Sequence, residues 1–155
     1  MSPPGNQSSP EIGETRPSPG VDFRLPIARM LVSALAAGGL VFVAGAIVVV
    51  ALRPGGFPGL AGGVGAGAAG PAVALLLIGP WKTRPLLRWG MLLFAAQGIS
   101  VVGAAALALL LYSATRPDPL VLVPALAATF VAVWATLARV FGAHVQALRA
   151  GAASR

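Results

Sequence analysis

The stretch MLVSALAAGGLVFVAGAIVVVAL, residues 30–52, decides the fold class of this chain. It contains no charged residue, and Arg29 and Arg53 stand immediately before and after it. A helix needs about 20 predominantly apolar residues to cross the hydrocarbon core of a bilayer. Residues 30–52 meet that requirement, so the sequence predicts a transmembrane helix here.

Three more uncharged apolar blocks follow, at about residues 60–78, 89–113 and 120–138. Segments rich in Pro, Gly, Lys and Arg separate them, and Pro and Gly both oppose continuation of a helix. Each block is far longer than a typical strand. We therefore expect an all-α integral membrane protein, a four-transmembrane-helix bundle whose membrane domain spans residues 25–142.

The composition points to the same class. Of the 155 residues, 57% are hydrophobic and only 10% are charged, against about 25% charged in soluble domains. The net charge of +7 comes from residues at the edges of the apolar blocks, where membrane anchors lie. No basic face is interleaved with aromatic residues, so we expect the lipid bilayer as a partner and no nucleic acid. The absence of cysteine excludes disulfides and thiolate metal sites.

Both ends of the sequence are polar. Residues 1–24 are rich in Pro, Ser and Gly and lack the apolar surface needed to offset chain entropy, so we expect a disordered tail. Residues 143–155 form a short basic tail and are a candidate continuation of the last helix.

The distribution of Lys and Arg predicts the orientation. Nine of the 11 fall on one side of the four-span scheme, and the other side has Arg53 and Arg116. Basic loops stay in the cytoplasm, so both termini and the loop 79–88 are expected there. Trp81 and Trp89 are expected to anchor that interface. The predicted topology anchors are Arg29, Lys82, Arg84, Arg88 and Arg139.

Two rows of small residues, each with a member at every fourth position, precede Pro71: Gly59, Gly63 and Gly67, and Gly62, Ala66 and Gly70. In lipid, small residues let helix backbones approach closely and gain dispersion contacts. Two interpretations remain open: packing within this chain's own bundle, or a docking face for a glycine-rich helix of another protein. Pro71 lacks an N–H and is expected to disturb the helix locally.

Gln97 is the most polar side chain deep in the third block, and Ser100 follows one turn later. An unbonded amide in hydrocarbon is costly, so Gln97 is expected to face the bundle. An interhelical hydrogen bond is one interpretation of this pair, and a part in handling an ion or a substrate is the other.

No Asp, Glu, Lys, Arg or His lies inside any of the four blocks. Proton relays and most ion-coupled carriers need a titratable group at membrane depth. The single histidine, His144, has no acidic neighbour and makes a poor metal site. No nucleophile, base and orienting group can be assembled, so we expect no enzymatic activity, no metal and no cofactor.

The layout resembles the ATP synthase subunit I family, small four-helix membrane proteins associated with bacterial F-type ATP synthase. The resemblance covers about residues 25–142. Its features are a charged segment before the first helix, a Gly-rich second helix ending in Pro71-Ala72-Val73, a basic loop with tryptophan, and a polar pair in the third helix.

The resemblance implies a bacterial inner membrane location and a role in assembling the ring of c subunits. Many family members carry an acidic residue and, three positions later, a lysine in the third helix, where this chain has the neutral Gln97 and Ser100. A family role in handling divalent cations therefore does not carry over, whereas helix packing against c subunits does. A structural membrane protein and a small uncharged pore or carrier subunit are the alternatives.

Overall fold

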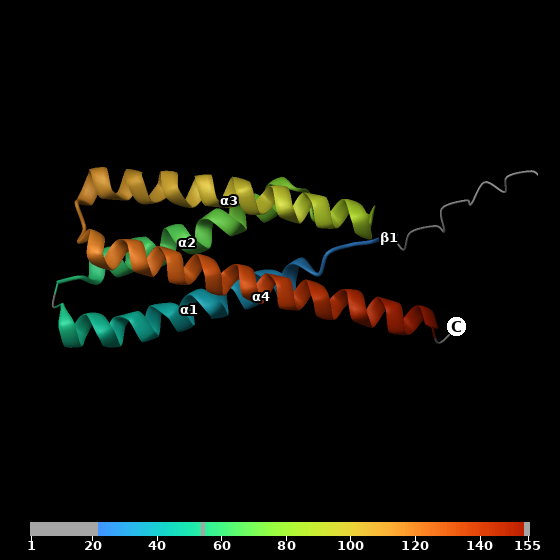
Figure 1. Cartoon of the computed structure of the whole chain (residues 1–155), viewed down its shortest axis with the longest axis horizontal. Helices are drawn as coiled ribbons and strands as arrows, with labels where there is room; N and C mark the ends of the chain where they lie inside the picture. The colour runs from blue at the N-terminus through green and yellow to red at the C-terminus, as the bar shows by residue number, and fades with distance from the viewer. Residues whose placement is uncertain (1–21, 54, 154–155) are drawn as a thin grey trace, which may run out of the picture.

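The computed structural model describes residues 22–53 and 55–153 and is an antiparallel bundle of four long helices (Figure 1). The helices are α1 (Ile27–Leu52), α2 (Phe57–Leu77), α3 (Leu86–Thr115) and α4 (Pro119–Ala153). By length and composition, all four can span a membrane. The prediction of an all-helical chain with four helices long and apolar enough to cross a membrane is therefore confirmed. The predicted disordered tail falls almost wholly on residues 1–21, which lie outside the described part of the chain.

Both ends of the described chain lie at the same end of the bundle (Figure 1). We call this the termini end, and we call the opposite end, with the α1–α2 and α3–α4 connections, the turn end. This arrangement follows from an even number of antiparallel spans joined by short connections. It places the described ends of the chain and the α2–α3 connection at the same end of the bundle.

The helices extend beyond the apolar blocks. Three of them begin three residues before the predicted starts, and α4 continues through most of the predicted basic tail to Ala153. Apolar blocks mark the part of a helix that lies in hydrocarbon, while the backbone ladder continues into the interface, where Lys and Arg reach water. Pro58 lies in the first turn of α2, where its missing N–H has no helical partner to lose.

A two-stranded antiparallel pair closes the termini end. Strand β1 (Asp22–Phe23) pairs with β2 (Arg84–Pro85), so the segment before α1 is tied to the α2–α3 connection. The sequence predicts only a loop at residues 79–88 and gives no signal for this pairing. Gly79 after α2 has φ +63°, the left-handed conformation that commonly ends a helix and that glycine adopts without strain.

Helix α2 is the most buried of the four, and its most extensive contacts are with α4 and α3. The first glycine row faces α4. A methyl group on Gly63 would lie 2.5 Å from the carbonyl oxygen of Leu122, and one on Gly67 would lie 2.8 Å from the carbonyl oxygen of Leu126. The backbones of α2 and α4 approach this closely because a hydrogen atom replaces the side chain.

The second row turns towards α3. A methyl group on Gly70 would lie 2.7 Å from the carbonyl oxygen of Ser100. One on Gly62 would lie between the two helices, 3.3 Å from the Leu122 side chain of α4 and 3.5 Å from the Leu111 side chain of α3. Ala66 and Pro71 are also buried in α2. Both rows therefore pack within the bundle, where α4 and α3 cover them.

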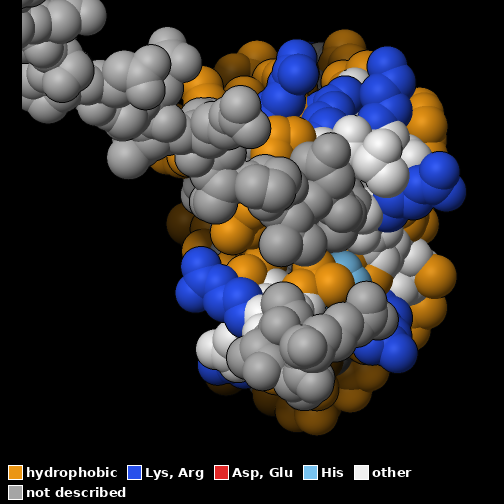
Figure 2. All heavy atoms as spheres, turned by 90° about the vertical axis from the view of Figure 1, so that its right-hand side faces the viewer, with side chains coloured by type: hydrophobic (Ala, Val, Ile, Leu, Met, Phe, Trp, Pro, Cys, Tyr) orange, Lys and Arg blue, Asp and Glu red, His pale blue; other side chains and the backbone are white. Residues whose placement is uncertain are grey.

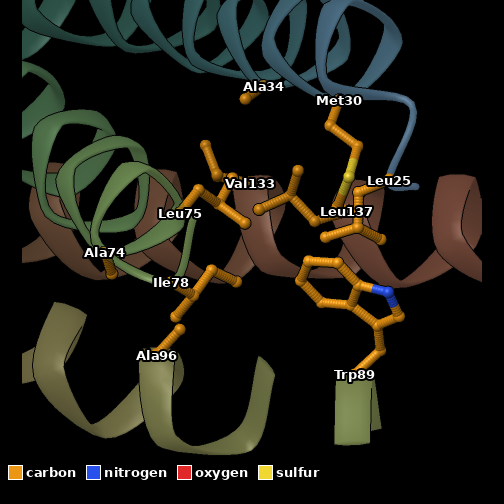
Figure 3. Close-up of a cluster of buried hydrophobic side chains, with 10 residues drawn as sticks. All are labelled: Leu25, Met30, Ala34, Ala74, Leu75, Ile78, Trp89, Ala96, Val133 and Leu137. Atoms are coloured by element: carbon orange, nitrogen blue, oxygen red, sulfur yellow. The ribbon is translucent and has the colours of Figure 1, made fainter. Parts of the chain in front are cut away.

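A hydrophobic core at the termini end joins all four helices (Figure 3). Trp89 is fully buried in it, and Met30 and Leu137 point towards its ring from α1 and α4. The Arg84 guanidinium lies 5.2 Å from the centre of the same ring, a cation–π geometry. The predicted interfacial anchor role of Trp89 is therefore wrong, because the indole fills the space between the helices, whereas Trp81 is exposed as expected. A smaller core at the turn end contains Val49, Leu60, Val121 and Ala125.

Replacing Gly63 by Leu should lower the free energy of unfolding by about 3 kcal/mol or more, because added atoms would overlap the α4 backbone. The matched control is Gly65→Leu on the same helix, since Gly65 is exposed and has no atom within 4 Å of its methyl position. Reversible unfolding in mixed micelles measures both variants. Equal stability of the two variants would contradict the packing described for α2.

Candidate functional site

The outward side of α3 is the candidate functional site. Its best-covered side packs on α2, and it makes few contacts with α4. Large apolar side chains cover the other side, among them Phe94, which is 79% exposed, and Val101. We define the α3 face as the residues that share this side at helical spacing: Gly90, Phe94, Gln97, Gly98 and Val101.

Gln97 lies in the middle of the α3 face, and its side chain is exposed. The expectation that this amide faces the bundle is therefore wrong. The reason is helical spacing: α3 turns its small residues Ala96, Ser100 and Ala104 towards α2, and Gln97 follows Ala96 on the next side of the helix. Within residues 22–53 and 55–153, no side chain forms a hydrogen bond with the amide of Gln97.

The depth of Gln97 makes its exposure significant. Helix α3 has 30 residues, which corresponds to about 45 Å at 1.5 Å per residue. The hydrocarbon core is about 30 Å thick. With equal overhang at both ends, Gln97 lies roughly 9 Å inside the hydrocarbon. An amide at this depth, facing outward, has no water to bond with.

Space around Gln97 is open. The side chain borders a hollow of about 310 Å³ between α3 and α4, which Phe94, Trp134 and Phe141 also line. Nothing lies within 4 Å of the methyl position of either Gly90 or Gly98. The α3 face therefore offers a mostly apolar surface with one amide in it, beside a hollow that reaches Met30 and Leu137, and two positions where another backbone can approach.

Ser100 is buried and performs the interhelical bonding predicted for the pair. The Trp134 Nε1–H of α4 donates to Ser100 Oγ at 3.1 Å, and the Ser100 hydroxyl donates to the Gln97 carbonyl oxygen at 2.8 Å. Ser100 therefore ties α3 to α4, while the Gln97 side chain is exposed beside the hollow between these two helices. The sequence gives no way to choose Trp134 as the donor.

Inside the bundle, Ser100 and Thr129 are the fully buried polar side chains among the described residues. Thr129 lies beside Gly38 of α1 and Gly67 of α2, and its hydroxyl has no hydrogen-bond partner within the described part of the chain. The pore alternative would be favoured by a polar path through Gln97, but Gln97 is exposed and is not among these buried polar residues. The geometry therefore does not favour the pore alternative.

An ion pair joins the two connections at the turn end. Arg53 Nη1 donates to Asp118 Oδ2 at 2.7 Å, and the Leu120 backbone N–H donates to Asp118 Oδ1 at 2.9 Å. The Arg53 guanidinium and then the Leu120 N–H hold the pKa of Asp118 below its usual range. The sequence marks Arg53 as a flanking charge but gives no sign of its partner, which is 65 residues away.

The predicted topology anchors at the termini end differ in their exposure and in the residues beside them (Figure 2). Lys82 and Arg88 are exposed, whereas Arg84 is half-buried over Trp89. Arg29 and Arg139 are exposed and line hollows between α1 and α4. Figure 2 shows Lys and Arg side chains gathered around the rim of this end of the bundle.

Comparisons with known protein families, with curated proteins and with solved structures gave no match to this chain.

Replacing Ser100 by Ala should lower the free energy of unfolding by about 1 kcal/mol, because Trp134 loses its acceptor. Trp134→Phe should lose more through packing, but Ser100→Ala should then cost little more in that background. The control is Ser113→Ala, whose exposed hydroxyl bonds only within α3. Unfolding in micelles measures all four variants, and fully additive losses would argue against this bond.

Proposed function

We propose that this protein is an accessory or assembly factor of a membrane complex and acts by helix packing through the α3 face. The observation that supports this is the exposed amide of Gln97 at hydrocarbon depth on an otherwise apolar, open surface. Polar groups within a membrane are costly unless they find a partner. A partner helix that donates to or accepts from Gln97 would remove that cost.

The chemistry of the α3 face defines the partner. Gly90 and Gly98 leave room for a close backbone approach, and Phe94 and Val101 supply apolar contact area on either side of Gln97. Small residues and one interhelical hydrogen bond are the usual means by which membrane helices associate. The partner is therefore a transmembrane helix with small residues and a hydrogen-bonding group at the depth of Gln97.

The resemblance to the ATP synthase subunit I family supports c subunits of ATP synthase as that partner. The sequence suggested the glycine rows of α2 as a docking surface, but these rows lie inside the bundle. The proposed contact surface for c subunits is therefore the α3 face.

The orientation in the proposal is that of a bacterial inner membrane protein with the termini end in the cytoplasm. Among the described residues, Arg24, Arg29, Lys82, Arg84, Arg88 and Arg149 belong to the segments at the termini end, and Arg53 and Arg116 to those at the turn end. An excess of Lys and Arg in short loops keeps those loops in the cytoplasm.

Gln97→Leu should lower the recovery of c subunits with the tagged protein at least about fivefold, because it removes the hydrogen bond across the contact. Gly98→Leu should also lower recovery, because it fills the space for a partner backbone. The matched control is Gly39→Leu on α1, which adds the same bulk at another exposed position with nothing nearby. Co-purification in mild detergent and quantitative mass spectrometry provide the readout.

All three variants should unfold like the wild-type protein, so a loss of recovery reports the contact rather than folding. Equal recovery by Gln97→Leu, Gly98→Leu and Gly39→Leu would count against the α3 face. Failure of the wild-type protein to recover c subunits would count against that partner, and a second copy of this chain in the eluate would identify self-association instead.

Alkaline phosphatase fused after Arg155 should be inactive, whereas the enzyme inserted between Gly55 and Gly56 in the α1–α2 connection should be active. Phosphatase needs the oxidising periplasm to fold, and the charge distribution places Arg155 in the cytoplasm. Green fluorescent protein at the same two positions should give the opposite pattern. Activity of the phosphatase at Arg155 would reverse the orientation.

A further inference from the structure

A groove follows the contact between α1 and α4 from the termini end into the membrane-spanning part of the bundle. Two hollows, of about 520 Å³ and 510 Å³, form it and share Ser33. Most of the side chains that line the deeper hollow are small, so the two facing helices leave this space unfilled. We call this the α1–α4 groove, and the residues used below are Arg29, Ser33, Ala36, Ala135, Arg139 and His144.

Basic side chains gather at the outer part of this groove. Arg29 and His144 line the upper hollow, and Arg139 lines the deeper one. Within residues 22–53 and 55–153, neither Arg29 nor Arg139 forms an ion pair. At the turn end, by contrast, Arg53 also borders a hollow between α1 and α4 but is paired with Asp118. Among the described residues, no acidic side chain is therefore paired with these two arginines at the termini end of the groove.

The length of the groove matches one leaflet. From Arg29 to Val41, the α1 side of the two hollows spans about 18 Å at 1.5 Å per residue. Half of the hydrocarbon core is about 15 Å. Below its basic mouth the groove is apolar, with Ala36, Leu40 and Ala132 on its walls. A ligand that fills it must combine an anionic head with an apolar chain of leaflet length.

We propose that the α1–α4 groove binds an anionic phospholipid from the leaflet on the side of the termini end. The Arg29 and Arg139 guanidinium groups hold the phosphate, since their planar forks match its oxygens. One acyl chain lies on the alanine floor. Basic pockets between membrane helices recognise acidic head groups in this way. A zwitterionic lipid carries its own cation beside the phosphate, so it gains less from the two arginines.

The test is a titration of the purified full chain in detergent with phosphatidylglycerol or phosphatidylcholine, with bound lipid counted by native mass spectrometry. We expect tighter binding of phosphatidylglycerol. Arg29→Gln with Arg139→Gln should weaken it about tenfold or more. The control is Lys82→Gln with Arg88→Gln, which removes the same charge from the same end of the bundle outside the groove, and it should retain most of the affinity.

A second pair of variants tests the acyl chain site without changing the charge. Ala36 and Ala135 are exposed and line the deeper hollow of the groove, where the acyl chain is proposed to lie. Ala36→Leu with Ala135→Leu should fill this space and weaken binding of phosphatidylglycerol, while the fold stays intact. Inorganic phosphate should not displace the lipid, because it lacks the chain. The proposal is overturned if the two lipids bind equally, or if the groove variants and the control variants lose the same affinity for phosphatidylglycerol. It is also overturned if Ala36→Leu with Ala135→Leu leaves binding unchanged, or if inorganic phosphate displaces the lipid.

Discussion

The bundle depends on the close approach of the α2 backbone to α4 and α3. Carbonyl oxygens of α4 lie where side chains on Gly63 and Gly67 would be. A carbonyl oxygen of α3 lies in the same way where a side chain on Gly70 would be. Inside a bilayer the hydrophobic effect does not drive helices together, so short-range dispersion contacts have to supply the association energy. The close contact places α2 in the centre and leaves α1 and α3 with their long apolar sides facing outward.

This central position of α2 determines which surfaces are free for other work. The two small-residue rows of α2 are packed on α3 and α4 and are therefore covered within the bundle. Helix α3 packs one side on α2 and makes few contacts with α4, which leaves the Gln97 amide outside. Between α1 and α4, several alanines line a groove that carries arginine at one end. The proposed protein partner and the proposed lipid thus use different helices.

Much of the fold could be predicted because the relevant signals are local. An uncharged block such as residues 30–52 needs no information from the rest of the chain to be assigned to a membrane helix. The small-residue rows of α2 could be recognised as packing surfaces for the same reason. Their partner helices could not, because spacing along one helix gives the side that packs but not the helix that it meets. Likewise Trp89 has the sequence context of an interfacial anchor, and only the presence of Met30, Leu137 and Arg84 around it makes it a core residue.

The sequence by itself determined that the chain forms four helices long and apolar enough to cross a membrane, since this property depends on transfer free energies that add along the chain. The tertiary structure decided the direction in which each polar side chain points. Ser100 is buried and accepts a hydrogen bond from Trp134 of α4, whereas Gln97, one turn earlier, is exposed, because the close packing of α2 decides which side of α3 is covered. The pairing of Arg53 with Asp118 was decided in the same way, by two connections that the antiparallel bundle brings together at one end.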